Sequence, residues 1–226
     1  MCRSCGGGAP VDVHFCPQCT KILTLSRHGD YFAFLGVPRK LNLDVADLEE
    51  RFRGLSRQFH PDYFYNAPLS ERRASLERSS YLNDAYRTLR HPGTRIEYLL
   101  QVEGITPDES VPQDSKGGSA LTVPPALLEE VFALNEELDE VRAMREAGAA
   151  EGEWKGRLQR ARQPIDAKRA DHERDLKELS AKWDALVDEG AGEKQRRAVL
   201  AALHERMLER NYINNLLAGI ERELAA

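Results

Sequence analysis

The chain opens with four cysteines in two pairs, Cys2-x-x-Cys5 and Cys16-x-x-Cys19. A two-residue spacing lets both sulfur atoms of a pair point to one side of a tight backbone knuckle, and four thiolates complete a tetrahedron around one metal ion. The spacing therefore predicts a metal site whose ligands are Cys2, Cys5, Cys16 and Cys19. The neighbouring His14 is not needed, because four sulfurs already saturate the ion.

Zinc in a structural role is the favoured occupant of this site, but the sequence leaves alternatives open. Tetrahedral sulfur ligands also suit iron, as in rubredoxin-like centres. A pair of redox disulfides is disfavoured, because no βαβ pattern surrounds either cysteine pair. Since residues 1–28 are too few to bury a core, metal binding should supply their folding energy. We expect this segment to be a structural clip; a docking surface or a sensor of metal and oxidant is the alternative.

The tripeptide His60-Pro61-Asp62 is the second candidate for chemistry. Pro61 disfavours the α conformation at His60, so a preceding helix should end here and leave Asp62 on a turn. A carboxylate held on a turn suits recognition of an arginine on a partner protein, because the planar fork of arginine binds such an acceptor through two hydrogen bonds. We assign no acid–base chemistry to His60.

The elements that position this turn can be read from apolar spacing. Over residues 44–59, steps of three and four predict a helix with one apolar stripe, formed by Val45, Leu48, Phe52, Leu55 and Phe59. Outside the stripe, a basic face is expected from Arg51, Arg53 and Arg57.

Two further helices flank this region. Residues 30–36 predict a short helix that ends at Gly36. A longer helix should run from Ser70 to about Arg90, where His91-Pro92 stops it. Its inner face is expected to hold Leu82, Ala85 and Leu89.

A short helix, a basic helix, the turn and an antiparallel helix together resemble a J domain, the module that stimulates the ATPase of DnaK-type heat-shock chaperones. Four stretches narrow the resemblance to the HscB family, the J-domain co-chaperones of iron–sulfur cluster biogenesis: Tyr31-Phe32 with Leu35-Gly36, Phe59 to Phe64, Asn83 to Leu89, and Tyr98-Leu99-Leu100. The resemblance runs from the cysteines to the C-terminus and is densest over residues 30–104. Some HscB relatives carry a four-cysteine segment and others lack it.

The resemblance implies a role for each residue around the turn. Asp62 would contact an arginine near the nucleotide domain and linker of a DnaK/HscA-type chaperone, while His60 and Pro61 would hold the turn geometry. The arginines at positions 51, 53 and 57 would steer and orient the encounter, with a strong dependence on salt.

The rest of the chain predicts a linker and a helical bundle. Residues 105–123 are rich in turn residues and lack apolar periodicity. Pro124-Pro125 opens a helix with an apolar seam at Leu127, Val131, Leu134, Leu138 and Val141. A second helix covers residues 154–186, where Pro164 should break or kink it, and a third follows Gly192. The expected fold is all-α, with a J domain at 29–104 and an antiparallel three-helix bundle at 124–226.

Two apolar residues of the bundle, Leu128 and Phe132, flank the seam rather than continue it. Extra apolar surface at one end of a helix indicates a second contact, either with the J domain or with a partner. The HscB resemblance favours the partner, because the matching positions in that family hold the iron–sulfur scaffold protein; they are Leu128, Phe132, Glu136 and Tyr212. Glu129 and Ala133 depart from the family pattern, and Tyr212 is equally well explained as a core aromatic.

Bulk properties narrow the function classes. The 226 residues carry a net charge of −5, which argues against a zinc-ribbon nucleic-acid binder, and no apolar run is long enough to span a membrane. The N-terminus resembles neither a signal nor a transit peptide, so we expect a cytoplasmic protein. No Walker-type glycine loop is present, so we expect no enzyme activity, with ATP hydrolysed by the partner. A general folding J protein is the nearest alternative, and a thiol oxidoreductase is a more distant one.

Overall fold

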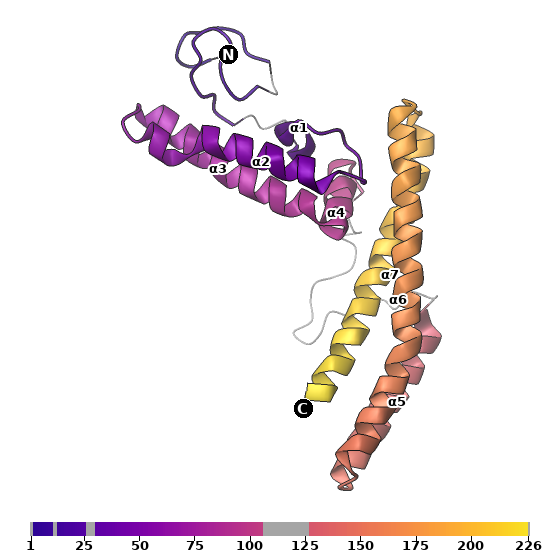
Figure 1. The fold of residues 1–226 in the computed structure, drawn as a ribbon. Helices are drawn as coiled ribbons and strands as arrows, with labels where there is room; N and C mark the ends of the chain where they lie inside the picture. Colours follow the sequence, from indigo (N-terminus) through magenta and orange to yellow (C-terminus); the bar gives the residue numbers. More distant parts are fainter. Residues whose placement is uncertain (1, 11–12, 26–29, 106–126, 226) are drawn as a thin grey trace. The chain divides into compact units, whose positions relative to one another are not determined.

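The computed structural model describes residues 2–10, 13–25, 30–105 and 127–225 of the chain. Within these ranges the secondary structure is helical, apart from one isolated antiparallel bridge between Phe15 and Ile22, so the predicted all-α class is confirmed (Figure 1). The elements are α1 Tyr31–Leu35, α2 Val45–Phe59, the 3₁₀ helix η1 Pro61–Phe64, α3 Leu69–Arg90, α4 Pro92–Val102, α5 Leu128–Glu146, α6 Glu151–Asp188 and α7 Glu193–Ala225.

Contacts divide the chain into two compact units. The first comprises Met1–Gly104 together with Trp183–Ala191, and the second comprises Ile105–Lys182 and Gly192–Ala226. The predicted linker at 105–123 and the helix start at Pro124-Pro125 fall almost wholly outside the described residues.

In the first unit, α1 is a short helix with a defined cap at each end. The Asp30 side chain accepts a hydrogen bond from the Ala33 N–H at 2.8 Å, which satisfies a free donor of the first turn. Gly36 closes the helix with φ 65°, a left-handed conformation that suits glycine. The predicted helix and its end at Gly36 are therefore confirmed.

Helices α2 and α3 form a helical hairpin, joined by η1. Leu48 and Phe59 of α2 are completely buried, and α3 contributes the predicted inner face of Leu82, Ala85 and Leu89. The predicted stripe is wrong at one position: Val45, the first residue of α2, is 42% exposed.

Helix α4 follows α3 directly, since Pro92 is tolerated in the first turn of a new helix. Tyr98 of α4 stacks on Tyr31 at a centroid distance of 4.3 Å and accepts a hydrogen bond from the Tyr31 N–H at 2.9 Å. Buried Arg95 donates to the carbonyl oxygens of Leu89 and Arg90, which lie at the end of α3 without helical partners.

The tip between α6 and α7, which the sequence places in the bundle, belongs by its contacts to the first unit. The Trp183 indole N–H donates to the Arg39 carbonyl at 2.8 Å. The Asp184 carboxylate accepts from the backbone N–H groups of Leu41 and Asn42 at 2.6 and 2.9 Å. The segment before α2 thus has its backbone donors satisfied by a distant part of the chain.

The second unit is a bundle of three long helices. Its core contains most of the predicted seam of α5 and meets residues of α6 and α7, namely Leu127, Val131, Leu134, Val141, Trp154, Leu158, Ile165, Ile213, Leu217 and Ile220. Of the predicted break or kink at Pro164, the break is wrong, because α6 is continuous from Glu151 to Asp188, while the kink stays a prediction. Proline leaves the Arg160 carbonyl without its helical donor, but Leu158 and Ile165 on either side are buried in the core and hold the helix together.

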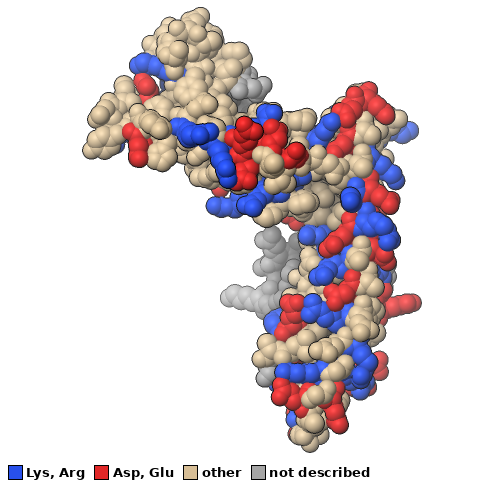
Figure 2. All heavy atoms as spheres, in the orientation of Figure 1, with Lys and Arg blue, Asp and Glu red and all other residues tan. Residues whose placement is uncertain are grey.

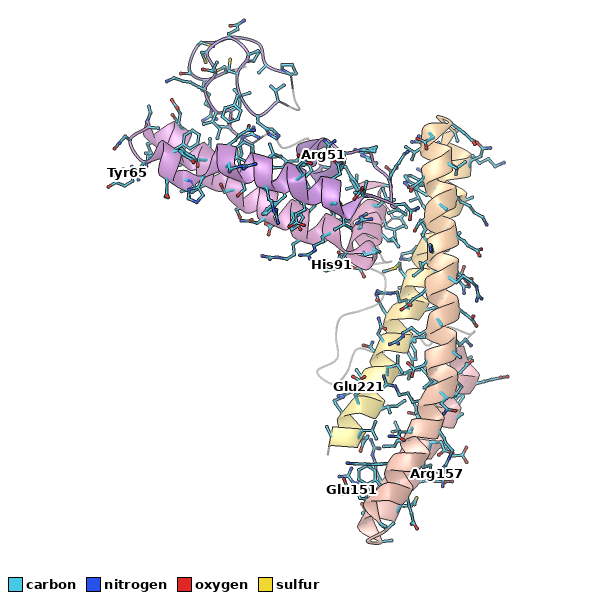
Figure 3. The ribbon with its side chains drawn as sticks, viewed as in Figure 1. Arg51, Tyr65, His91, Glu151, Arg157 and Glu221 are labelled. Atoms are coloured by element: carbon cyan, nitrogen blue, oxygen red, sulfur yellow. The ribbon has the colours of Figure 1, made fainter. Side chains whose placement is uncertain are left out.

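Ion pairs follow the flanks of the bundle. Figure 2 shows acidic and basic side chains interleaved along it. Arg157 of α6 pairs with Glu137 of α5 at 2.5 Å, and Arg142 of α5 pairs with Glu223 of α7 at 2.9 Å. Figure 3 places Glu151, Arg157 and Glu221 towards one end of the bundle. None of the described helices combines the length and apolar character needed to cross a bilayer.

Candidate functional site

The turn of His60, Pro61 and Asp62 lies at one end of the helical hairpin; Figure 3 marks that end by Tyr65 and the opposite end by His91. The α2 helix ends at Phe59, as Pro61 requires. His60 then caps η1, its Nδ1 accepting the Asp62 N–H at 3.4 Å. The Asp62 carboxylate is 87% exposed, so it is held on a defined turn and remains open to solvent.

The backbone next to the turn is fixed from α3. A helix end leaves carbonyl groups without partners, and the Phe59 carbonyl at the end of α2 is such a group. It accepts hydrogen bonds from two hydroxyls one helical turn apart, Ser75 Oγ at 2.6 Å and Ser79 Oγ at 3.0 Å. Ser75 is completely buried. These two bonds determine the direction in which the chain leaves α2.

The three arginines predicted to form a basic face differ in their surroundings. Arg51 pairs with Asp47 at 2.9 Å and donates to the Gly36 carbonyl, and Arg53 pairs with Glu49 at 2.6 Å. Arg57 is exposed and has no ion pair among the described residues. The uncompensated positive charge of α2 is therefore concentrated in its last turn, beside Asp62, where it also complements the helix dipole.

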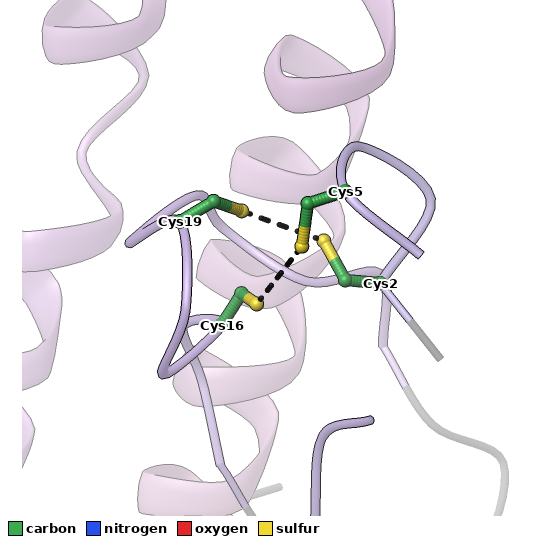
Figure 4. A group of neighbouring side chains, drawn as sticks. All are labelled: Cys2, Cys5, Cys16 and Cys19. Atoms are coloured by element: carbon green, nitrogen blue, oxygen red, sulfur yellow. Dashed lines mark hydrogen bonds between the residues drawn. The ribbon is translucent and has the colours of Figure 1, made fainter. Parts of the chain in front are cut away.

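The four cysteines form one cluster. Their Sγ atoms all lie within 4.8 Å of one another, with Cys2 and Cys19 3.7 Å apart and Cys5 and Cys16 also 3.7 Å apart (Figure 4). Sulfurs at the corners of a tetrahedron around zinc, with bonds of about 2.3 Å, would be about 3.8 Å apart. The cluster therefore fits a four-coordinate metal ion.

The electrostatics of the cluster point the same way. Backbone N–H groups of Ser4 and Cys5 lower the pKa of Cys2 to about 6. The Lys21 N–H lowers the pKa of Cys19, but burial and the neighbouring sulfurs together outweigh it and raise that pKa to about 12. Four thiolates cannot all ionise at this spacing without a cation among them.

The two cysteine knuckles have the same backbone pattern. Each begins with a cysteine whose carbonyl accepts a bond from the residue four positions later: Gly6 for Cys2 and Thr20 for Cys16, both at 2.9 Å. Those two residues have positive φ angles, 70° and 57°. Thr20 is the only non-glycine among the described residues with a positive φ, and the tight knuckle accounts for this strain.

The predicted partner-binding residues of the bundle differ in how far they are exposed to solvent. Leu128 and Phe132 on α5 are 40% and 71% exposed, and Glu136 is exposed one turn further on. Tyr212 on α7 is half-buried and packs against the bundle core. The core-aromatic explanation therefore accounts for part of its side chain.

The ion pair between Arg142 of α5 and Glu223 of α7 marks the sides of the two helices that face each other, and Leu128 and Tyr212 can be placed relative to it. Leu128 lies about four turns before Arg142, and Tyr212 about three turns before Glu223, so each lies on the same face of its helix as a member of the pair. Figure 1 shows α5 and α7 running in the same direction, both antiparallel to α6, so Leu128 and Tyr212 precede the Arg142–Glu223 pair by similar distances along their helices. Leu208, which the sequence reasoning missed, adds a 43%-exposed side chain one turn before Tyr212. We call Leu128, Phe132, Leu208 and Tyr212 the apolar patch.

Sequence reasoning also missed a buried charge beside the turn. Arg78 is only 4% exposed and lies on the α3 face that carries Leu82, Ala85 and Leu89. The sequence did offer a signal, because Arg78 falls in phase with the apolar residues of this helix. A charged residue at such a position is buried only if other groups of the protein accept its hydrogen bonds.

Comparisons with known proteins support the fold. The sequence matches no protein-family model. The chain is similar to the crystal structure of human co-chaperone protein HscB, with a TM-score of 0.65 and 26% identity over 98% of this chain and 97% of that chain. It is also similar to chaperone HscB from Vibrio cholerae, with a TM-score of 0.56 and 26% identity over 86% of this chain and 96% of that chain. The likeness to HscB co-chaperones inferred from sequence motifs thus extends to the three-dimensional structure.

Proposed function

We propose that this chain is a J-domain co-chaperone that brings an iron–sulfur cluster scaffold protein to a DnaK/HscA-type chaperone and stimulates the ATPase of that chaperone. The observation that carries the proposal is the exposed Asp62 carboxylate on a backbone-fixed turn, just after the helix end that carries Arg57, an arginine without an ion pair among the described residues. The similarity to HscB co-chaperones supplies the class of partner.

On the chaperone side, the turn provides one acceptor and the last turn of α2 provides positive charge. A partner arginine can meet the Asp62 carboxylate through two parallel hydrogen bonds. Arg57 would attract an acidic surface of the partner and orient the encounter. His60 and Pro61 act on the geometry of the turn, and the chain itself performs no chemistry on ATP.

On the client side, the apolar patch provides a docking surface for a folded protein. Aromatic and leucine side chains at the centre of an interface contribute most of the binding free energy, while charged neighbours such as Glu136 form the rim. The patch lies on α5 and α7 in the second unit, whereas the turn lies in the first. Two separate surfaces are what an adaptor between a chaperone and a client requires.

The four cysteines would hold a structural metal ion, with zinc favoured over iron. The ion would neutralise the clustered thiolates and supply folding free energy to a segment without a core of its own. Metal analysis of the purified chain should give one ion per chain, with zinc the expected element. Stoichiometric iron would change the assignment of the ion but not that of the ligands.

The proposal is tested by replacing Asp62 with asparagine, which keeps the shape of the side chain and removes its charge. Single-turnover ATP hydrolysis by a DnaK-type chaperone should be stimulated by the wild-type chain and not by Asp62→Asn, while calorimetric binding of the scaffold protein is unchanged. Asp84→Asn, which alters another exposed carboxylate on α3, is the matched control and should stimulate normally. Full stimulation by Asp62→Asn would remove the central residue of the proposal.

A further inference from the structure

The side chain that precedes the turn lies partly beneath the cysteine module, by which we mean residues 2–10 and 13–24. Phe59 is completely buried. The His14 ring packs edge-on against it at a centroid distance of 5.0 Å, and the Phe15 ring lies at 6.0 Å. Movement of the cysteine module would therefore expose the residue from which the chain enters the turn.

One small loop connects these ring contacts to the metal ligands. At its base, the Leu23 N–H donates to the His14 carbonyl at 3.0 Å, next to the bridge between Phe15 and Ile22. At its tip are Cys16 and Cys19, two of the four clustered sulfurs. The base and the tip are the two ends of one continuous hydrogen-bonded segment. A change in the conformation of the cysteines at the tip should therefore shift His14 and Leu23 at the base.

Arg78 joins this base to the turn. Its Nε donates to the Leu23 carbonyl at 2.7 Å, and its Nη1 lies 2.7 Å from His14 Nδ1. The guanidinium carbon also lies 5.7 Å from the centroid of the Phe59 ring. A buried guanidinium is stable only while its donors are satisfied, so Arg78 depends on the loop base remaining in place.

The same face of α3 holds the backbone of Phe59. Ser75 and Ser79, which flank Arg78 in sequence, donate to the Phe59 carbonyl. Helix α3 thus fixes the Phe59 carbonyl with two hydroxyls, and it covers the Phe59 ring with a guanidinium that is itself held by the cysteine module. The contacts form an unbroken chain from the Cys16–Cys19 knuckle to the residue before His60.

We propose that Arg78 is a positioning residue that couples metal occupancy of the four cysteines to the conformation of the His60–Asp62 turn. With metal bound, the loop base offers its acceptors and Arg78 lies over Phe59. Without metal, the knuckle loosens, Arg78 loses acceptors, and the turn samples conformations in which Asp62 is misplaced. The consequence for ATPase stimulation rests on the function proposed above, whereas the coupling within the chain does not.

The test is hydrogen exchange of the full-length chain, measured on the peptide covering residues 59–65 with zinc bound and after removal of zinc by a chelator. We expect exchange in this peptide to become about five- to tenfold faster without zinc, which corresponds to the net loss of about one hydrogen bond. A peptide from the bundle core, residues 158–165, should not change.

Variants separate coupling from general loosening. In Arg78→Leu, exchange of residues 59–65 should be fast with zinc present, and chelation should add nothing further. Arg87→Leu, an exposed arginine on the same helix, should behave as the wild type. If Arg78→Leu fails to fold, His14→Ala serves instead, because it removes one acceptor of Arg78 and one ring contact of Phe59; about half the effect is expected.

The outcomes distinguish this inference from the proposed function. Equal exchange of residues 59–65 in zinc-bound and chelated wild type overturns the coupling, whatever the ATPase assay shows. An additional effect of chelation in Arg78→Leu as large as in the wild type overturns the role of Arg78. Zinc-dependent exchange together with no ATPase stimulation by the zinc-bound chain leaves the coupling intact and refutes the proposed function.

Discussion

The two candidate binding surfaces of this chain are built in opposite ways. At the turn, one exposed carboxylate is held by backbone: Ser75 and Ser79 fix the carbonyl before the turn, and His60 caps the 3₁₀ helix after it. At the apolar patch, by contrast, exposed side chains stand on two regular helices, and only helix register sets their positions. Binding at the turn should therefore depend on the backbone conformation that places Asp62, and binding at the patch on the exposed apolar area of its side chains. Substitutions should accordingly act at a distance on the turn, and only by direct contact on the patch.

The largest effect is expected at the patch. Replacing both Leu128 and Phe132 with alanine removes exposed apolar area from the proposed interface, and the dissociation constant for the scaffold protein should rise at least about 30-fold, or about 2 kcal/mol. Titration calorimetry measures this value. Leu76→Ala removes a leucine of the other unit that is 58% exposed, between the values for Leu128 and Phe132, and should leave affinity unchanged. Unaltered affinity in the double variant would mean that these residues do not contact the client.

The turn is probed through residues that never touch a partner. In Ser75→Ala combined with Ser79→Ala, the Phe59 carbonyl loses both donors, and leaving a buried acceptor unpaired typically lowers the free energy of unfolding by about 1–3 kcal/mol. Chemical denaturation measures this loss.

The same double variant should also stimulate the chaperone less at saturating concentration, although Asp62 is intact. Either single variant retains one donor and should show less than half of the combined effect. Wild-type stimulation by a measurably destabilised double variant would show that the turn is not conformation-dependent and would remove the contrast with the patch.

A smaller effect is expected from the arginines of α2. Arg57→Gln removes an exposed positive charge from the last turn of α2 and should slow association with the chaperone about threefold at low salt, less at high salt. Arg53→Gln should do less, because Glu49 already offsets that charge. Stopped-flow association rates at two salt concentrations measure the difference. Equal effects of the two variants would indicate that pairing on the helix surface does not matter for steering.

The bundle should respond to pH through one buried residue. His172 is 4% exposed, and burial lowers its pKa below the ordinary value of 6.5, outweighing the nearby Glu209, which raises it; Arg206, Asp175 and Lys168 also face it. The unfolded chain therefore binds a proton more readily than the folded chain. The contribution of this residue to stability is fully present above pH about 6.5 and is lost as pH falls below it. Thermal melting of His172→Gln should show a flatter pH profile in this range. An unchanged slope would assign the acid sensitivity to other groups.

Much of this architecture follows from local rules. Asp30 and Gly36 delimit α1, and Pro61 ends α2, because caps and proline act within a few residues of where they stand. The spacing of the cysteines led to the cluster for the same reason, since each knuckle closes on itself. Pro164 shows the limit of such rules: it does not end α6, because the flanking residues Leu158 and Ile165 are buried in the core.

The sequence by itself determined the helices, their apolar faces, the turn with its acidic residue and the two cysteine knuckles, because these depend on neighbours along the chain. Only the tertiary structure decided that Arg78 lies between His14, Leu23 and the Phe59 ring, and that Asp184 satisfies the backbone before α2. Those pairings join residues 55 and 143 positions apart, and no local periodicity encodes which buried donor will meet which acceptor. The physical reason is that a buried polar group is stable only when it has hydrogen-bond partners, and here the whole fold brings those partners together.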